Sequence, residues 1–282
     1  MTRAFRSLPL LASGLLLSTA LGACGATSTD VAIGFEGLIG GEAAACGVAY
    51  DGIGATGSTL TLADYRLYVS DVRLLTDDGT EAPVALTQDG EWQLEDIALL
   101  DFEDGGAGCP TGTPDTRTVV EGTVAESGPF TGIRFVLGVP FDRNHDDVSV
   151  APTPMNLTAM FWNWQGGYKF LRVDGTTTGL PDGFRVHLGS TGCDGDPVMG
   201  GTTSCANPNR PEVTLSGFDP TEQRIRVDIA GVLATTDIDQ DGGGQPGCMS
   251  GPQDPECPAV FERLGLPFGG NPAGTQQLFS GP

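Results

Sequence analysis

The chain has two histidines, His145 and His187, and they are its clearest candidates for metal ligands. A neutral imidazole suits both copper and zinc, so the pair predicts a metal site if the fold brings the rings together. One shared ion requires their ring nitrogens to lie within roughly 4 Å of each other. A thioether of Met155, Met160 or Met199 could supply a third ligand. The alternative is two separate surface or structural histidines, because a spacing of 42 residues gives no support by itself.

An acidic motif gives a second candidate metal site. Asp237-Ile238-Asp239-Gln240-Asp241-Gly242 matches the first six positions of an EF-hand loop, so Asp237, Asp239 and Asp241 could bind calcium. The twelfth position is Cys248 rather than Glu, which favours a plain acidic turn. The sequence has no GxSxG, HExxH or phosphate-loop motif. We therefore expect no enzymatic activity of the chain's own.

The N-terminus has the parts of a bacterial lipoprotein signal peptide. Arg3 and Arg6 precede an apolar run at 10–21 that is too short to span a membrane as a helix. Leu21-Gly22-Ala23-Cys24 then resembles a lipobox, whose cysteine takes a diacylglycerol. We expect removal of residues 1–23, lipidation of Cys24, a tether at 24–30, and a lipid-anchored protein in the cell envelope that faces the periplasm or the exterior. An ordinary signal peptide cut nearby would instead leave Cys24 free.

The charge excludes one class of partner. The first 23 residues carry two arginines and no acidic residue, so the mature chain has 12 basic and 36 acidic residues and a net charge of −24. Such a chain does not bind nucleic acid or anionic lipid by electrostatic attraction. It would attract cations or a basic partner, although solubility accounts for most of the carboxylates.

Six cysteines follow Cys24, and an even number in an exported chain indicates disulfides. Short loops favour the pairs Cys193–Cys205 and Cys248–Cys257, which leaves Cys46–Cys109. The alternative is a thiolate metal site, which the oxidising compartment and the lack of a CxxC pair disfavour.

Apolar residues alternate with period two in several segments separated by turn residues, which is typical of an antiparallel β-sandwich. These segments are 31–35, 65–69, 133–139, 184–188 and 225–229, and His187 lies on the face opposite Phe184, Val186 and Leu188. Two stretches instead predict short helices, at 154–164 and 258–264. We therefore expect an all-β, disulfide-braced fold with one or two short helices.

A tryptophan motif and several shorter motifs follow one another along the chain. The run Met160-Phe161-Trp162-Asn163-Trp164-Gln165-Gly166-Gly167-Tyr168-Lys169-Phe170 contains the sequence WxW. The others are YVSDVRL at 68–74, LDF at 100–102, GVPF at 138–141 followed by Asn144-His145, HLGSTGC at 187–193, GCMSG at 247–251 and DPEC at 254–257. In this order they resemble the MbnP-like copper-binding proteins, also called the metallo-mystery pair four-Cys motif family. The resemblance covers residues 31–280, and we expect residues 31–282 to form one MbnP-like β domain.

The resemblance implies a function. Members of this family are periplasmic or surface proteins paired with a MauG-like di-haem enzyme, which oxidises a tryptophan to kynurenine, and they bind copper through histidines near the modified residue. The matching positions here are His145 and His187 as copper ligands, Trp162 and Trp164 as the tryptophans, and the four-Cys positions Cys193, Cys205, Cys248 and Cys257. Trp92 is a weaker candidate for modification. The competing hypothesis is a non-catalytic structural or adhesive surface domain that binds calcium.

The role of each tryptophan depends on the local structure. If 154–164 is a helix, Trp164 shares the apolar face with Leu157, Met160 and Phe161, and Trp162 points about 200° away from it. Trp164 would then pack in the core, with a cost of roughly 3–5 kcal/mol for Trp164→Ala, and Trp162 would be the oxidation target. An extended segment would instead direct both rings to one face.

Overall fold

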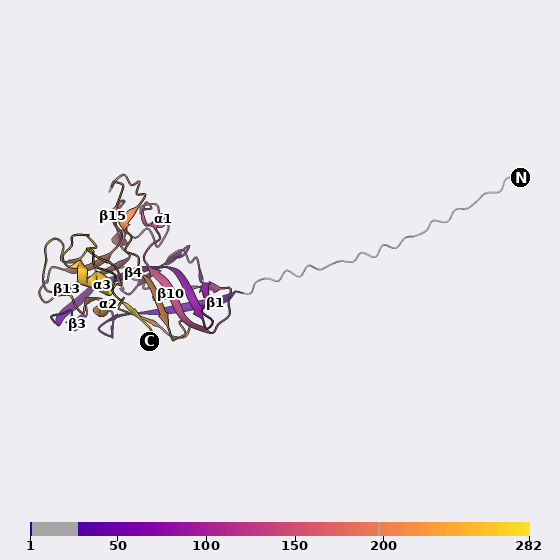
Figure 1. Ribbon diagram of the computed structural model, residues 1–282, viewed down its shortest axis with the longest axis horizontal. Helices are drawn as coiled ribbons and strands as arrows, with labels where there is room; N and C mark the ends of the chain where they lie inside the picture. Colours follow the sequence, from indigo (N-terminus) through magenta and orange to yellow (C-terminus); the bar gives the residue numbers. More distant parts are fainter. Residues whose placement is uncertain (2–27, 197) are drawn as a thin grey trace.

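The computed structural model describes residues 28–196 and 198–282, together with Met1 (Figure 1). The expected signal peptide and Cys24 lie outside the described residues. The first strand, β1, begins at Thr29, so Thr29 and Asp30 belong to the sheet rather than to the expected tether. In the part of the chain that the structure describes, no helix is long and apolar enough to cross a membrane.

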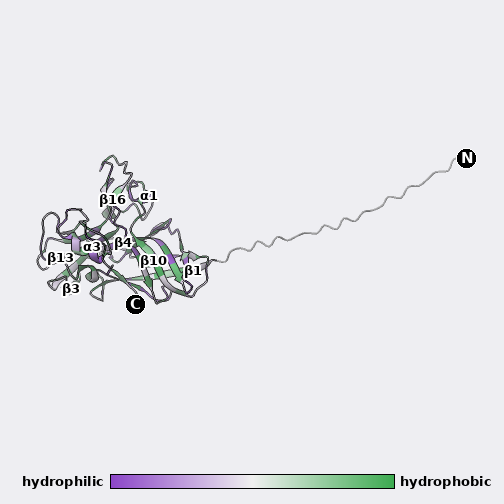
Figure 2. Cartoon of the chain, in the orientation of Figure 1, coloured by the Kyte–Doolittle hydropathy of each residue, from purple (hydrophilic) through white to green (hydrophobic). Residues whose placement is uncertain are grey.

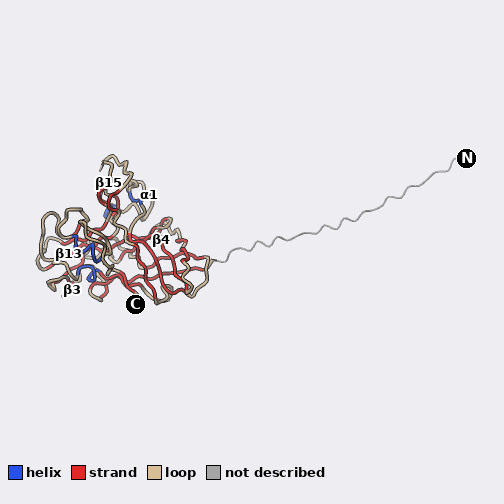
Figure 3. The backbone as a smooth tube through the Cα atoms, viewed as in Figure 1, coloured by secondary structure: helices blue, strands red, loops and turns tan. Residues whose placement is uncertain are grey.

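Two large sheets make up most of the fold (Figures 1 and 3). One consists of β1 (Thr29–Ile39), β2 (Glu42–Ala43), β6 (Ala85–Leu86), β9 (Val119–Val124), β18 (Ile225–Asp228) and β20 (Phe279–Ser280). The other consists of β3 (Ala49–Ile53), β4 (Ser58–Thr76), β5 (Glu81–Pro83), β7 (Gln93–Leu94), β8 (Ile97–Asp101), β10 (Phe130–Leu137), β13 (Leu171–Thr177), β14 (Phe184–Leu188), β17 (Glu212–Ser216) and β19 (Gly247–Cys248). The pairings are antiparallel except β1–β18 and β14–β19, which are parallel. The predicted all-β class is confirmed.

The two sheets pack face to face around an apolar core. The ring of Phe135 on β10 lies edge-on to Phe35 on β1 and to Phe279 on β20, with centroid distances of 5.9 and 4.9 Å. The Tyr65 hydroxyl on β4 crosses the same interface and donates to the Val227 carbonyl at 2.9 Å. Figure 2 shows the apolar residues concentrated along strands such as β10. The predicted alternation at 31–35, 65–69, 133–139 and 184–188 therefore marks the faces that form this core.

Three short α-helices accompany the sheets in the described part of the chain. The helix predicted at 258–264 is confirmed as α3 (Cys257–Arg263), which has Pro258 in its first turn. Two others were not predicted: α1 (Phe141–Asn144) and α2 (Ile229–Leu233). Ile229, which the alternation assigned to a strand, begins α2 because Asp228 ends the strand and caps the helix by accepting from the Ala230 amide.

All three predicted disulfides are confirmed. Cys46–Cys109, Cys193–Cys205 and Cys248–Cys257 have Cα separations of 5.4, 3.8 and 4.6 Å, all below the limit of about 7 Å for a bridge. Cys109, Cys248 and Cys257 are fully buried, whereas both cysteines of Cys193–Cys205 are partly exposed. The Cys193–Cys205 disulfide is therefore the most accessible of the three to a reagent in the solvent.

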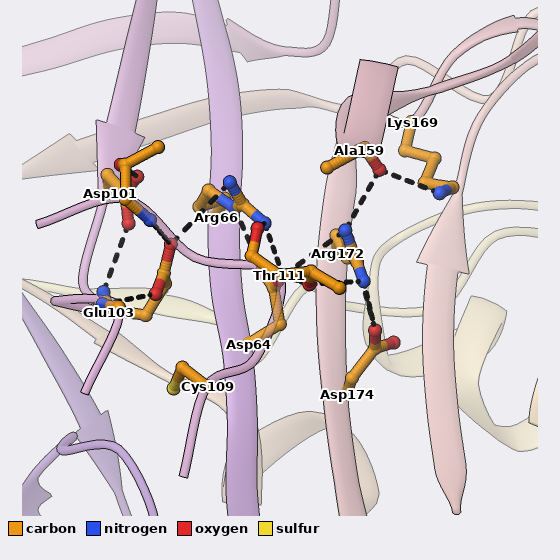
Figure 4. Close-up of polar contacts among 12 residues, drawn as sticks. Asp64, Arg66, Asp101, Glu103, Cys109, Thr111, Ala159, Lys169, Arg172 and Asp174 are labelled. Carbon is orange, nitrogen blue, oxygen red and sulfur yellow. Dashed lines mark hydrogen bonds and ion pairs between the residues drawn. The ribbon is translucent and has the colours of Figure 1, made fainter. Parts of the chain in front are cut away.

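The second face of β4 is also buried, and it carries charges (Figure 4). Arg66 has no exposed surface, donates from Nε to Asp64 at 2.9 Å and pairs with Glu103 at 3.5 Å. Arg172 on β13 joins Asp64 at 3.2 Å and also pairs with Asp174. We name Asp64, Arg66, Asp101, Glu103, Arg172 and Asp174 the buried ionic network. It lies beneath the loop that carries Thr111, so alternation alone could not predict that this face is covered.

Asp101 gives this network a pH dependence. Burial raises the pKa of Asp101 from 3.8 to about 8, and the negative charge of Glu103 adds to this shift while the backbone hydrogen bond from Glu103 opposes it. A carboxyl whose pKa is raised in the folded state stabilises the fold below its unfolded pKa, and that contribution is lost as the pH rises towards the folded value.

We expect Asp101→Asn to remove part of this pH dependence. Between pH 4 and pH 8 the free energy of unfolding of the parent protein should fall relative to that of the variant, because the unfolded Asp101 ionises first. Urea denaturation at several pH values checks the difference. An equal pH slope in the two proteins would show that Asp101 is ionised in the folded state.

Candidate metal centre

The tryptophan motif forms a hairpin, and the predicted helix at 154–164 is wrong. The segment makes a single 3-10 turn (Thr158–Met160), then β11 (Phe161–Asn163), a turn and β12 (Gly167–Tyr168). Aromatic residues favour strands, and Asn163 accepts the Gly166 amide at 2.7 Å to close the turn. Of the apolar residues whose spacing suggested a helix, Met160 is fully buried, and Leu157 and Phe161 pack against the core from partly buried positions. We name residues 161–168 the tryptophan hairpin.

The two tryptophan rings have different neighbours. Trp162 lies over Gly189, where an added Cβ would be 2.4 Å from its ring, and it lines a pocket of about 370 Å³ together with Cys193 and Met249. Trp164 lies near Gly200, where the equivalent distance is 3.6 Å. Both rings are half-buried. The expectation that Trp164 alone packs in the core is therefore wrong, and the large cost predicted for Trp164→Ala loses its basis.

His145 is held against the tryptophan hairpin. The buried Asn144 accepts the Tyr168 amide at 2.9 Å, and an added Cβ at Gly167 would be 2.3 Å from the Asn144 carbonyl. This close approach places His145, the residue after α1, beside the turn. Its Nδ1 lies 3.1 Å from the Trp164 carbonyl, and its Nε2 lies 3.2 Å from the Asn144 amide nitrogen.

These two contacts require the same tautomer. A carbonyl only accepts, so Nδ1–H donates to Trp164, and the Asn144 amide donates to the lone pair of Nε2. Burial lowers the pKa of His145 below 6.5, against the raising effect of the Trp164 carbonyl, so the ring is neutral at pH 7. A backbone carbonyl that fixes one ring nitrogen while the other keeps its lone pair is the usual arrangement of a metal-binding histidine.

Two sulfur atoms lie beside this lone pair. Cys193 and Cys205 pair across the hairpin of β15 (Thr191–Cys193) and β16 (Cys205–Asn207), and His145 Nε2 is 3.5 Å from Cys205 Sγ. The ligand atoms of His145, Cys193 and Cys205 lie within 4.8 Å of one another. Gln165 donates to the carbonyls of Cys193 and Gly195, which joins the tryptophan hairpin to this sulfur hairpin.

His187 lies elsewhere, at the buried ionic network. Its Nε2 donates to Asp174 at 2.5 Å, and its buried Nδ1 has no hydrogen-bond partner within the described residues. Burial lowers the pKa of His187, although Asp174 acts in the opposite direction, so this ring is also neutral. His145 and His187 share no hydrogen-bond partner, and the donor group that contains His145 leaves out His187. The two histidines therefore make no contact with each other, and His187 instead faces Asp174 on the neighbouring strand β13.

The other predicted ligands are also dispersed. Met155 and Met160 are buried in the core, and Met199 is exposed. Asp239 accepts from Ser58 and the Gly179 amide, while Asp237 and Asp241 each accept a nearby backbone amide. No group of three close ligand atoms forms from these carboxylates in the described parts of the chain, so the calcium hypothesis gains no support. Trp92 packs against the core in the turn before β7.

The donor set fits copper in part. His145 supplies a neutral imidazole nitrogen held in the right tautomer, as copper prefers. Both neighbouring sulfur atoms are in a disulfide, which is not the thiolate form that binds metal. One nitrogen does not make a tight site by itself, so a further donor is required.

Fold and site together define a class of protein: a disulfide-braced β-sandwich that presents a histidine beside a WxW turn. The MbnP family model matches residues 28–250, and the chain belongs to this family. Among solved structures, MbnP from Methylosinus trichosporium is similar, with 35% sequence identity, a TM-score of 0.78, and coverage of 90% of this chain and 98% of that one. No curated protein matches the chain.

Several residues that build the site had no role predicted from the sequence. Asn144, Gln165 and Gly167 attach the tryptophan hairpin to α1 and to the sulfur hairpin. The only indication in the sequence was their position in the motifs that contain His145 and Trp164. Their roles depend on contacts between distant segments, which no local pattern records.

Proposed function

We propose that this protein is a lipid-anchored envelope protein that binds copper and serves as the tryptophan-oxidation substrate of a MauG-like di-haem partner. The observation that supports it most is the contact of His145 with the WxW turn, through the Trp164 carbonyl. A neutral imidazole and two partly exposed tryptophans thus occur at one place in a chain of the MbnP family. In this proposal the chain is a substrate and a metal carrier, and the catalyst is its partner.

In this proposal the residues have separate roles. Trp162 lines an open pocket, so its ring is available to an oxidising partner. Oxidation to kynurenine opens the indole ring and leaves an aromatic amine, which is a nitrogen donor. His145 and that amine would then hold copper. The Trp164 carbonyl would keep the imidazole in the binding tautomer, and copper would replace the Asn144 amide at Nε2.

Peptide mapping of the protein made with and without its di-haem partner tests this proposal. We expect kynurenine at Trp162 only when the partner is present. Trp162→Phe should abolish the modification, and Trp164→Phe is the matched control that should retain it. Oxidation confined to Trp164 or Trp92 would contradict the assignment, and no oxidation at any tryptophan would contradict the substrate role. The same spectra report whether Cys24 carries lipid.

A further inference from the structure

We propose that reduction of the Cys193–Cys205 disulfide converts the sulfur hairpin and His145 into a Cys₂His site for a soft monovalent cation, Cu(I). This inference rests on the proposed copper function and concerns the same histidine, but it requires no oxidised tryptophan. Three observations carry it: the compact donor group, the accessibility of the disulfide, and the contacts that hold the hairpin closed without it.

The donor group differs from the other two places where disulfide sulfurs lie near a third ligand atom. Glu103 beside Cys46–Cys109 accepts the amides of Gly105 and Thr113, and Asp254 beside Cys248–Cys257 likewise accepts backbone amides. His145 Nε2 instead has one contact with a side-chain amide, at 3.2 Å, and faces Cys205 Sγ. Only there does a neutral nitrogen donor accompany two sulfurs, among the groups formed by described residues.

Hydrogen bonds and strand pairing also hold the sulfur hairpin closed, in addition to its disulfide. Asp194 accepts the amides of Thr203 and Ser204 at 2.6 and 2.8 Å, and the Asp194 amide donates to the Ser204 carbonyl. Thr191 pairs with Asn207 at the other end of the two strands. After reduction, these bonds keep the two thiols opposite each other and next to His145. The site is therefore largely preorganised, which reduces the entropic cost of binding.

Reduction of the Cys193–Cys205 disulfide requires one co-reactant, a dithiol. Its thiolate attacks one sulfur of the partly exposed disulfide, and the exchange leaves Cys193 and Cys205 as two thiols and the reductant as its own disulfide. Two electrons and two protons pass to the protein. Cu(I) then binds both sulfurs and His145 Nε2, and the two thiol protons are released. Thiolate and imidazole ligands are the types that Cu(I) prefers.

A Cu(I) titration of protein made without the di-haem partner tests this inference. The protein is reduced with a phosphine, freed of reductant without air, and titrated against a coloured Cu(I) chelator. Alkylation mapping should show Cys193 and Cys205 as the first cysteines to open. We expect one Cu(I) per reduced chain, with thiolate-to-copper absorption in the near ultraviolet, and no such absorption from the oxidised chain. The His145→Ala variant should bind Cu(I) roughly tenfold or more weakly, and His187→Asn is the control that should bind normally.

Two further arms keep the test decisive. The Cys193→Ser/Cys205→Ser double variant should lose Cu(I), and, in case it does not fold, alkylation of the reduced parent protein should have the same effect. Cu(I) binding that survives alkylation, or equal binding by oxidised and reduced chains, would overturn the inference. The proposed function would stand in that case, because it concerns the chain with an oxidised tryptophan and an intact disulfide.

Discussion

Replacing Arg66 by methionine is expected to lower the free energy of unfolding by about 3–5 kcal/mol, because it leaves Asp64 and Glu103 buried without their cation. All three side chains are fully buried, so water cannot replace the lost partner. Arg172 compensates only in part, since it lies 3.2 Å from Asp64 but also pairs with Asp174. Urea denaturation measures the loss.

Arg134→Met is the matched control for this change. Arg134 lies on β10 and pairs with Asp71, Glu81 and Glu212, of which Glu81 and Glu212 are exposed and Asp71 is partly exposed. Exposed ion pairs contribute about 0–1 kcal/mol, so this variant should stay close to the parent protein. Adding Asp64→Asn to Arg66→Met should restore part of the lost stability, because one uncompensated charge is removed. If Arg66→Met lowers the free energy of unfolding no more than Arg134→Met does, then Arg66 does not stabilise the buried ionic network.

The sequence predicted features that depend on local order. The alternation at Tyr65, Leu67 and Val69 identified the inner face of β4, and loop length identified the disulfide pairs. It did not predict that Arg66 on the other face is buried, because its cover comes from residues more than 30 positions away. The helix at 154–164 failed for a related reason: an apolar spacing compatible with a helix also suits a hairpin whose partners lie in other segments.

The candidate site was predictable to a similar extent. The motifs identified His145, Trp162 and Trp164, and the structure places His145 at the WxW turn. They could not show that His187 pairs with Asp174, because this contact joins β13 to β14. The side chain of His187 does lie opposite the apolar residues of its strand, as alternation indicates, but the ionic network buries it there.

This separation of the histidines leads to an expected result for copper binding by the partner-oxidised protein with its disulfides intact. His145→Ala should abolish stoichiometric copper binding, because His145 is the imidazole whose lone pair faces the candidate site. His187→Asn should retain copper, since His187 is not among the donors grouped with His145 and its side chain is buried beside Asp174. The two variants remove the same donor type from one chain, so each controls for the other.

Metal analysis after dialysis, followed by competition with a copper chelator, measures both variants. Near-ultraviolet circular dichroism checks that the tryptophan hairpin keeps its structure in His145→Ala, since the lost Nδ1 hydrogen bond also holds the Trp164 carbonyl. Copper lost from His187→Asn but kept by His145→Ala would place the site at the ionic network instead. Loss in both would require the two rings to approach each other, which would mean that the segments carrying them rearrange when copper binds.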